Sequence, residues 1–355
     1  MKFIVHAGQP KAGSTAIQAF LGANRSQLAV NRVMVPRYRL GGSHQWMIAL
    51  ATPVSFLERK AMAFRHGRLR PTPGWWLATI ARLEFLLLWV QLRLLRPDTV
   101  ILSAEQFLGL RSPATAGRFA GVLRFLGADE IEIVLFLRDP VQHSVSQLLE
   151  QLKRGTADKH ALPPSRPLAV MDFVKHFSRF SDVQLSFFEY RGRQAGQDVR
   201  LDFIRNCLHH PSLEGLVLHA EENNPSISPE VGYLLSIFRE THYPQIDGRP
   251  RPSRIRQLKE QLIAAEEELG GPLTPRISAE ARDAIESLSQ PYLEWLETKH
   301  GFSFSSSGQT SSIPITSTDW LLGKTGSRLV SAVFELDDRR ISALVNATDD
   351  LAFLR

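Results

Sequence analysis

The chain has 355 residues, of which 43% are hydrophobic and 22% are charged, and this composition excludes a disordered chain or a fibrous repeat. With 42 Lys and Arg residues against 36 Asp and Glu residues, the net charge is +6. This charge favours anionic partners such as nucleotides, nucleic acid or an acidic membrane surface. The single cysteine, Cys207, excludes an intrachain disulfide and a multi-cysteine metal site.

The N-terminal apolar run at residues 3–5 is too short for the hydrophobic region of a signal peptide, so we expect a cytoplasmic protein. The longest apolar stretch, residues 83–95, contains Glu84 and Arg93. It is well under the roughly 20 apolar residues that a membrane-spanning helix needs, so no transmembrane segment is predicted.

Short apolar segments alternate with helical patterns along the chain. The predicted strands are residues 3–5, 99–102, 131–137 and 185–188, and the predicted helices include 198–208, 228–240 and 253–269. Strands that are apolar throughout are typical of a parallel sheet that is covered on both faces. We therefore expect an α/β fold with a P-loop-like, doubly wound parallel sheet flanked by helices.

The domain organisation predicted from the sequence is one large domain with additions. Residues 1–302 are expected to form the α/β domain, with a basic helical insertion at about 53–97 between two prolines. Residues 303–355 are expected to be a C-terminal extension that packs on the same domain, with apolar and polar residues alternating over 329–334. Glycine- and proline-rich residues 248–252 and serine-rich residues 302–312 predict linkers or surface loops.

The first motif is the segment Gly8 to Thr15 (GQPKAGST), which lies between the first predicted strand and a predicted helix. In this context backbone N–H groups and the helix N-terminus bind an anionic phosphate. Lys11 adds a cation, and Ser14 and Thr15 add hydroxyl donors. A Walker A loop has its lysine directly after the second glycine, whereas Lys11 precedes Gly13 by two residues, so Walker A does not match. The alternative is an ordinary strand-to-helix turn with an exposed lysine.

The second motif is Arg138-Asp139-Pro140, which follows the apolar strand at 131–137, with Ser146 eight residues after the arginine. A guanidinium offers a rigid fork of donors to phosphate oxygens, and Ser146 on the next helix can donate to the same phosphate. Pro140 suits the first turn of a helix. The alternative is that Arg138 pairs with a surface carboxylate.

Together the two motifs resemble those of sulfotransferases that use 3′-phosphoadenosine 5′-phosphosulfate, especially bacterial members. The segment HAGQPKAGSTAIQAFLGANRSQL is similar to the 5′-phosphosulfate loop of that family, Arg138 with Ser146 is similar to its 3′-phosphate motif, and residues 224–230 resemble a further segment. The resemblance implies that the donor is bound by a set of loop and strand-end residues. They are Pro10, Lys11, Ala12, Gly13, Ser14, Thr15, Arg138, Ser146 and Tyr190, the last near the adenine.

Sulfuryl transfer needs a base for the acceptor hydroxyl and a cation at the leaving phosphate, and no metal is chemically required. Lys11 is placed to neutralise the bridging oxygen, and the resemblance puts a catalytic His or Glu where Glu105 stands. His44 is the second candidate for the base or for acceptor binding. Glu105 has an alternative role as a helix cap behind Ser103. His6 is interpreted as a core histidine at the strand end.

The expected acceptor is a hydroxyl of a carbohydrate or glycolipid. Trp75, Trp76 and Trp89 could stack on sugars or touch a membrane face, although helix packing is the commoner use. A basic loop at 322–328 is a weak candidate for a further 3′-phosphate element. Two other classes stay open: a degenerate P-loop kinase, and a basic protein that binds nucleic acid or membrane through 65–70 and 249–256. No nucleic-acid motif accompanies those clusters, so nucleic acid is not an expected partner. The oligomeric state is not predicted.

Overall fold

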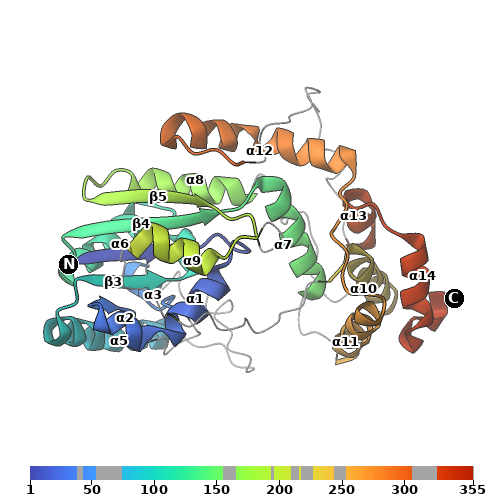
Figure 1. Cartoon of the computed structure of the whole chain (residues 1–355), viewed down its shortest axis with the longest axis horizontal. Helices are drawn as coiled ribbons and strands as arrows, with labels where there is room; N and C mark the ends of the chain where they lie inside the picture. Colours follow the sequence, from blue (N-terminus) through green and yellow to red (C-terminus); the bar gives the residue numbers. More distant parts are fainter. Residues whose placement is uncertain are drawn as a thin grey trace. The chain divides into compact units, whose positions relative to one another are not determined.

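Figure 1 shows the computed structural model of the chain, which describes residues 1–37, 43–52, 74–154, 165–192, 196–208, 216, 227–243, 253–305 and 326–354. The chain divides into two compact units. The first consists of Met1–Arg138 and Leu168–Glu222, and the second of Asp139–Pro167 and Asn223–Arg355. The predicted linker at 248–252, the basic cluster at 65–70 and most of the 322–328 loop lie outside the described residues.

The first unit contains a five-stranded sheet in which all neighbouring strands are parallel, with the order β2-β3-β1-β4-β5. The strands are β1 (Lys2–His6), β2 (Val33–Met34), β3 (Thr99–Ser103), β4 (Glu130–Leu137) and β5 (Val183–Glu189). The α/β class and the parallel sheet are therefore confirmed. The short edge strand β2 was not predicted, because two residues carry no apolar pattern.

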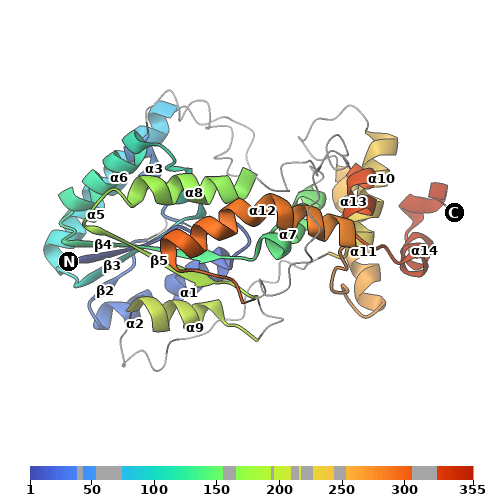
Figure 2. The same cartoon turned by 90° about the horizontal axis from the view of Figure 1, so that it is seen from above.

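Helices cover both faces of this sheet (Figure 2), which is why the four consecutive residues from Phe3 to His6 of β1 are buried. On one face, Ile4 packs with α1 (Ser14–Ala23), α2 (Arg25–Val30) and α9 (Val199–Phe203). The other face carries α6 (Pro113–Phe125) and α8 (Ser165–Phe177), whose side chains meet where the rings of Phe119 and Phe177 lie 6.3 Å apart. Burial on both sides accounts for the apolar strands seen in the sequence.

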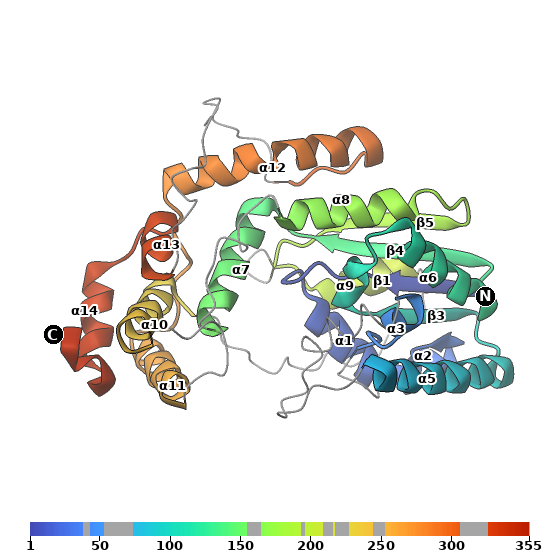
Figure 3. The same ribbon diagram turned by 180° about the vertical axis from the view of Figure 1, so that it is seen from behind.

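The predicted helical insertion contains a long helix, α5 (Gly74–Leu95), which leads directly into β3. It packs against the short helix α3 (Met47–Ala51), and Figure 3 shows the two side by side next to β3. Residues 53–73, the first part of the predicted insertion, lie outside the described residues.

The second unit is helical in the part that the structure describes. Its helices are α7 (Pro140–Arg154), α10 (Pro229–His242), α11 (Ser253–Glu268), α12 (Ala279–His300), α13 (Gly326–Val333), α14 (Asp338–Asn346) and a final 3₁₀ turn (Asp349–Leu354). Leu329, Val330 and Val333 of α13 are buried in a core shared with α10 and α11. Residues 329–333 of the alternating pattern thus form a helix, and Phe334 pairs with Ile277 in an isolated β-bridge. The expected C-terminal extension contributes to the core of the second unit together with α7.

Two helix starts follow their local sequence. Pro140 is the first residue of α7, and Asp139 Oδ1 accepts hydrogen bonds from the N–H groups of Val141 (3.0 Å) and Gln142 (3.1 Å). Ser228 caps α10 by accepting a hydrogen bond from Val231 N–H, with Pro229 following it. Pro140 thus begins a helix as predicted, and Ser228 with Pro229 begins the helix predicted at 228–240. Proline fits the first turn of a helix, and a capping oxygen satisfies N–H groups that have no partner within the helix.

Candidate functional site

The candidate site lies at the carboxyl ends of β1 and β4, which are neighbours in the sheet. After β1 the chain passes to β2 on one side of the sheet, whereas after β4 it passes to β5 on the other side. In open α/β sheets, ligands bind where the connections diverge in this way. The two predicted phosphate motifs directly follow these two strands, so the topology brings both to the same edge of the sheet.

The β1–α1 loop, residues 7–13, has a tight conformation that depends on its glycines. Gly13 has φ +81°, and a Cβ on Gly8 would overlap Ser14 Oγ. Lys11 also has a positive φ, of 68°, which is unusual for a residue with a side chain. Such a conformation costs of order 1–3 kcal/mol and persists where the surrounding structure imposes it, which is typical of ligand-binding sites. The backbone of the loop is therefore held in a strained form around Lys11.

Arg138 is joined to this loop by two hydrogen bonds. Its backbone N–H donates to Gln9 Oε1 (2.8 Å), and its guanidinium Nη1 donates to the carbonyl oxygen of Lys11 (3.3 Å). Gln9 is buried, with 3% of its surface exposed, and its backbone carbonyl oxygen accepts a hydrogen bond from Ala12 N–H at 3.1 Å. The structure thus places Lys11 and Arg138, 127 residues apart in sequence, at one point.

Tyr190 lies against the same loop. Its backbone N–H donates to the carbonyl of Leu137 at 2.7 Å, which sets it beside Arg138. The Arg138 guanidinium carbon lies 5.6 Å from the centre of the Tyr190 ring, within the range of a cation–π contact. A Cβ on Gly13 would lie only 2.9 Å from Tyr190 Cε2, so glycine is the residue that permits this approach. Three residues predicted from separate parts of the sequence therefore meet here.

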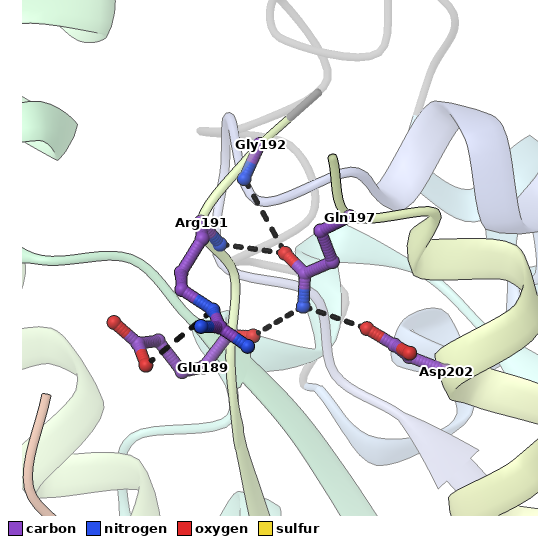
Figure 4. A network of polar contacts seen from close by, with 5 residues as sticks. All are labelled: Glu189, Arg191, Gly192, Gln197 and Asp202. Atoms are coloured by element: carbon purple, nitrogen blue, oxygen red, sulfur yellow. Dashed lines mark hydrogen bonds and ion pairs between the residues drawn. The ribbon is translucent and has the colours of Figure 1, made fainter. Parts of the chain in front are cut away.

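Gln197 holds the turn that carries Tyr190 (Figure 4). Its Oε1 accepts hydrogen bonds from the N–H groups of Arg191 (2.6 Å) and Gly192 (3.3 Å). Its Nε2 donates to the Glu189 carbonyl (2.8 Å) and to Asp202 Oδ2 (2.7 Å). One amide thereby satisfies backbone groups on both sides of Tyr190, and it links the end of β5 to α9. Sequence reasoning missed both Gln197 and Gln9, because a buried glutamine carries no spacing signal.

The start of α1 has polar groups that other side chains do not satisfy. The helix begins after Gly13, and this glycine at the N-cap position has no side chain that could cap it. Ser14 is 2% exposed, and its Oγ has no hydrogen-bond partner among the described residues. Buried hydroxyls are normally hydrogen-bonded, and uncapped N–H groups at a helix N-terminus attract anions. This geometry suits an anionic ligand at the loop. Ala12 is buried as well, whereas Thr15 is exposed.

His6 and His44 are buried on the two sides of Ser103. A hydrogen bond of 2.8 Å joins His6 Nδ1 and Ser103 Oγ, while Ser103 N–H donates to His44 Nδ1 at 2.8 Å. His44 Nε2 therefore carries its proton and donates to the Pro36 carbonyl at 3.0 Å. Burial lowers the pKa of His6 to about 3 and that of His44 to about 4. His6 is thus a core histidine, as predicted.

The second candidate for the base, His44, has both ring nitrogens engaged with backbone groups. It would have to give up one of these hydrogen bonds to accept a proton from a hydroxyl, and its burial disfavours the charged ring. The arrangement favours a structural role, in which His44 fixes the segment from Pro36 to the carboxyl end of β3. Gly41 and Gly42, quoted with His44 in the motif, lie outside the described residues.

Glu105 follows the carboxyl end of β3, the neighbour of β1 on its other side. It is half-buried at the start of a 3₁₀ turn (Glu105–Gly109). The Ala104 N–H donates to the His6 carbonyl at 3.1 Å and so fixes this position relative to β1. Ala104 occupies the N-cap position of this turn, so Glu105 is its first residue. A carboxyl group here stands at the same edge of the sheet as Lys11.

Ser146 belongs to α7 in the second unit, so the site described here consists of the first unit alone. Among the described residues, no group of three or more His, Cys, Asp and Glu side chains could hold a metal ion. In the same part of the chain, no helix is both long and apolar enough to cross a membrane. No protein-family model, curated protein or solved structure matches the chain.

Proposed function

We propose that the protein is a sulfotransferase that moves a sulfuryl group from 3′-phosphoadenosine 5′-phosphosulfate to a hydroxyl of a carbohydrate or glycolipid acceptor. The observation that carries this proposal is the hydrogen bonding of Arg138 to the β1–α1 loop through Gln9 and Lys11. Two cationic side chains and an uncapped helix N-terminus at one edge suit a ligand with two separate phosphate groups. The sequence resemblance adds the identity of the donor.

In this mechanism the β1–α1 loop binds the 5′-phosphosulfate through backbone N–H groups and the hydroxyls of Ser14 and Thr15. Arg138 binds the 3′-phosphate, and Tyr190 lies near the adenine. The acceptor oxygen bonds to sulfur as the bond between sulfur and the bridging oxygen breaks. Glu105 takes the acceptor's proton, and Lys11 neutralises the charge that develops on the leaving adenosine 3′,5′-bisphosphate.

The donor site is tested by calorimetric titration of the protein with adenosine 3′,5′-bisphosphate, with 5′-AMP, and with ATP plus magnesium. We expect micromolar binding of the bisphosphate, and a loss of about tenfold or more in Arg138→Ala because a charge-assisted phosphate contact is removed. Arg138→Ala should change 5′-AMP binding far less. Arg191→Ala removes the arginine that directly follows Tyr190 in the sequence, and it serves as the matched control.

Two results would contradict the proposal. A preference for ATP with magnesium would support the degenerate kinase instead, because a kinase binds the metal-bound triphosphate. If the wild type binds the bisphosphate and 5′-AMP equally well, and Arg138→Ala changes neither affinity, then Arg138 does not bind a 3′-phosphate. Oligonucleotide binding that falls steeply with salt would point to the basic nucleic-acid-binding alternative.

A further inference from the structure

Helix α5 has two apolar faces that point in opposite directions. One face packs on its own unit, where Ala81, Leu88 and Leu92 are at most 4% exposed. On the other side, large apolar side chains face outward. They are Trp76, Leu83, Leu86, Leu87, Val90 and Leu94, each between 39% and 76% exposed, and we call this set the α5 outer face.

The α5 outer face is continuous along the helix. Trp76, Leu83, Leu87, Val90 and Leu94 follow one another at intervals of seven, four, three and four residues, which places them on one side of a helix with 3.6 residues per turn. A 22-residue helix with this spacing exposes an apolar stripe about 30 Å long. Soluble proteins rarely expose continuous apolar patches of this size unless the patch contacts a protein or a membrane.

The net positive charge of the chain comes from the sequence segment that contains α5. Residues 53–97 contain eight of the 42 Lys and Arg residues and two of the 36 Asp and Glu residues. The rest of the chain has 34 residues of each sign, so this segment carries the whole net charge of +6. On α5 itself, Arg82 and Arg93 are exposed and lie three turns apart along one flank of the outer face.

We propose that the α5 outer face binds the surface of a lipid bilayer that contains anionic phospholipids. An interfacial helix inserts its apolar side below the headgroups while cationic side chains contact the phosphates, and tryptophan suits the boundary between the two. Trp76 at one end, the leucines between, and Arg82 with Arg93 on the flank match this arrangement. Because the opposite face of α5 is buried in its own unit, the helix lies along the membrane surface.

The same charge pattern disfavours a second copy of the chain as the occupant. A two-fold symmetric contact places each surface patch against its own counterpart. Two copies meeting on α5 would bring Arg82 and Arg93 of one copy close to those of the other, whereas an anionic bilayer neutralises these charges. This inference does not depend on the proposed reaction, since it rests on α5 and not on the site at the carboxyl ends of β1 and β4.

The test is co-sedimentation of the protein with vesicles made of equal parts of phosphatidylglycerol and phosphatidylcholine. We expect the wild type to bind, and the double variant Leu83→Glu/Leu94→Glu to lose about tenfold or more in affinity because charges replace inserted apolar groups. Both positions are exposed, at 57% and 76%, so the fold should tolerate the changes. The matched control is Leu168→Glu/Leu273→Glu, at exposed leucines outside α5 (49% and 52%), and it should bind like the wild type.

A second pair of measurements separates the contribution of the cationic side chains to vesicle binding from that of the apolar side chains. Arg82→Gln/Arg93→Gln should weaken binding to the anionic vesicles and should have little effect with pure phosphatidylcholine, where the wild type already binds weakly. Absence of wild-type binding, or equal binding by all variants, would overturn the proposal. A wild-type dimer that Leu83→Glu/Leu94→Glu converts to a monomer, without vesicle binding, would assign the face to a second copy.

Discussion

His6 and His44 are polar residues that the fold uses in neutral form. Each shares a hydrogen bond with Ser103, and each is fully buried at the carboxyl end of the sheet beside the β1–α1 loop. An imidazole can satisfy a hydroxyl or a backbone group while remaining uncharged, which a lysine or a carboxylate cannot do. These histidines therefore connect β1, β3 and the segment at Pro36 without adding a charge to the core.

The two histidines predict how stability depends on pH. Their pKa values are about 3 and 4 in the fold, against about 6.5 in the unfolded chain, so the unfolded state binds more protons below pH 6.5. The stability that the two neutral histidines contribute is therefore fully present above pH 6.5, and it is lost progressively as the pH falls toward 4. We expect His6→Gln to make the fall shallower, by up to about 1.4 kcal/mol per pH unit.

Urea unfolding between pH 4.5 and 7, followed by circular dichroism, measures this dependence. The control is His242→Gln, which changes an exposed histidine. Its free energy of unfolding should change with pH in the same way as that of the wild type. If His6→Gln and the wild type lose stability in parallel over this range, His6 is not held neutral by the fold.

Glu105 is the residue on which the proposed proton transfer depends. Glu105→Gln keeps the size of the side chain but removes its ability to accept a proton, so turnover should fall by roughly 10²–10⁴-fold. Affinity for adenosine 3′,5′-bisphosphate should stay within about twofold, because Glu105 is assigned to the acceptor and not to the donor. Measured together, sulfuryl transfer and nucleotide binding identify the role, with Glu84→Gln on α5 as the control. Normal turnover in Glu105→Gln would show that another group is the base.

At the scale of elements, the β1–α1 loop depends on contacts with two other segments. Arg138 at the end of β4 holds it through Gln9, and Tyr190 after β5 closes against Gly13, with the turn at Tyr190 held by Gln197. Each of these elements folds from a recognisable local pattern. The loop conformation, with Lys11 at positive φ, results from their combination.

Gly13→Ala tests this combination. An alanine at φ +81° is strained, and its Cβ would lie 2.9 Å from both Tyr190 Cε2 and Val199 Cγ1. We expect a loss of about 1–3 kcal/mol of stability and weaker bisphosphate binding, because the loop and Tyr190 must move apart. Thermal unfolding and calorimetric titration measure the two effects.

Gly121→Ala is the opposite case and the control. Gly121 lies within helix α6, and a Cβ there meets nothing within 4 Å. Alanine should therefore raise stability by about 0.5–1 kcal/mol through its higher helix propensity, without a change in nucleotide binding. If Gly13→Ala has the same stability and nucleotide binding as Gly121→Ala, then the β1–α1 loop does not need a glycine at positive φ at position 13.

At the scale of the whole molecule, each unit has its own hydrophobic core. The core of the second unit draws on residues far apart in sequence, from Val141 in α7 to Leu351 near the C-terminus. The sequence predicts one α/β domain over residues 1–302, which includes α7, α10, α11 and α12, and a C-terminal extension over residues 303–355. Local patterns give the helices but not their partners, so the membership of this core was not predictable from them.

Leu329→Ala tests the contribution of α13 to that core. Leu329 is fully buried, and its truncation should cost about 2–5 kcal/mol and leave a cavity beside α10. Hydrogen exchange of the α10 amides should become faster by the factor that corresponds to this loss of stability. Leu273→Ala removes the same atoms from a 52% exposed side chain and should have little effect. Unchanged protection of α10 in Leu329→Ala would mean that α13 does not support this core.

Local sequence patterns are enough to predict the α/β class of the fold and the positions of the two predicted phosphate motifs. Apolar runs set the strands, a glycine-rich segment set the loop after β1, and Pro140 set the start of α7. Three features are visible only in the folded chain: Gln9 holds Arg138, both ring nitrogens of His44 form hydrogen bonds, and one apolar face of α5 points outward. These features depend on which strands are neighbours and which helix faces are covered. Such contacts join residues far apart in the chain, so no local pattern specifies them.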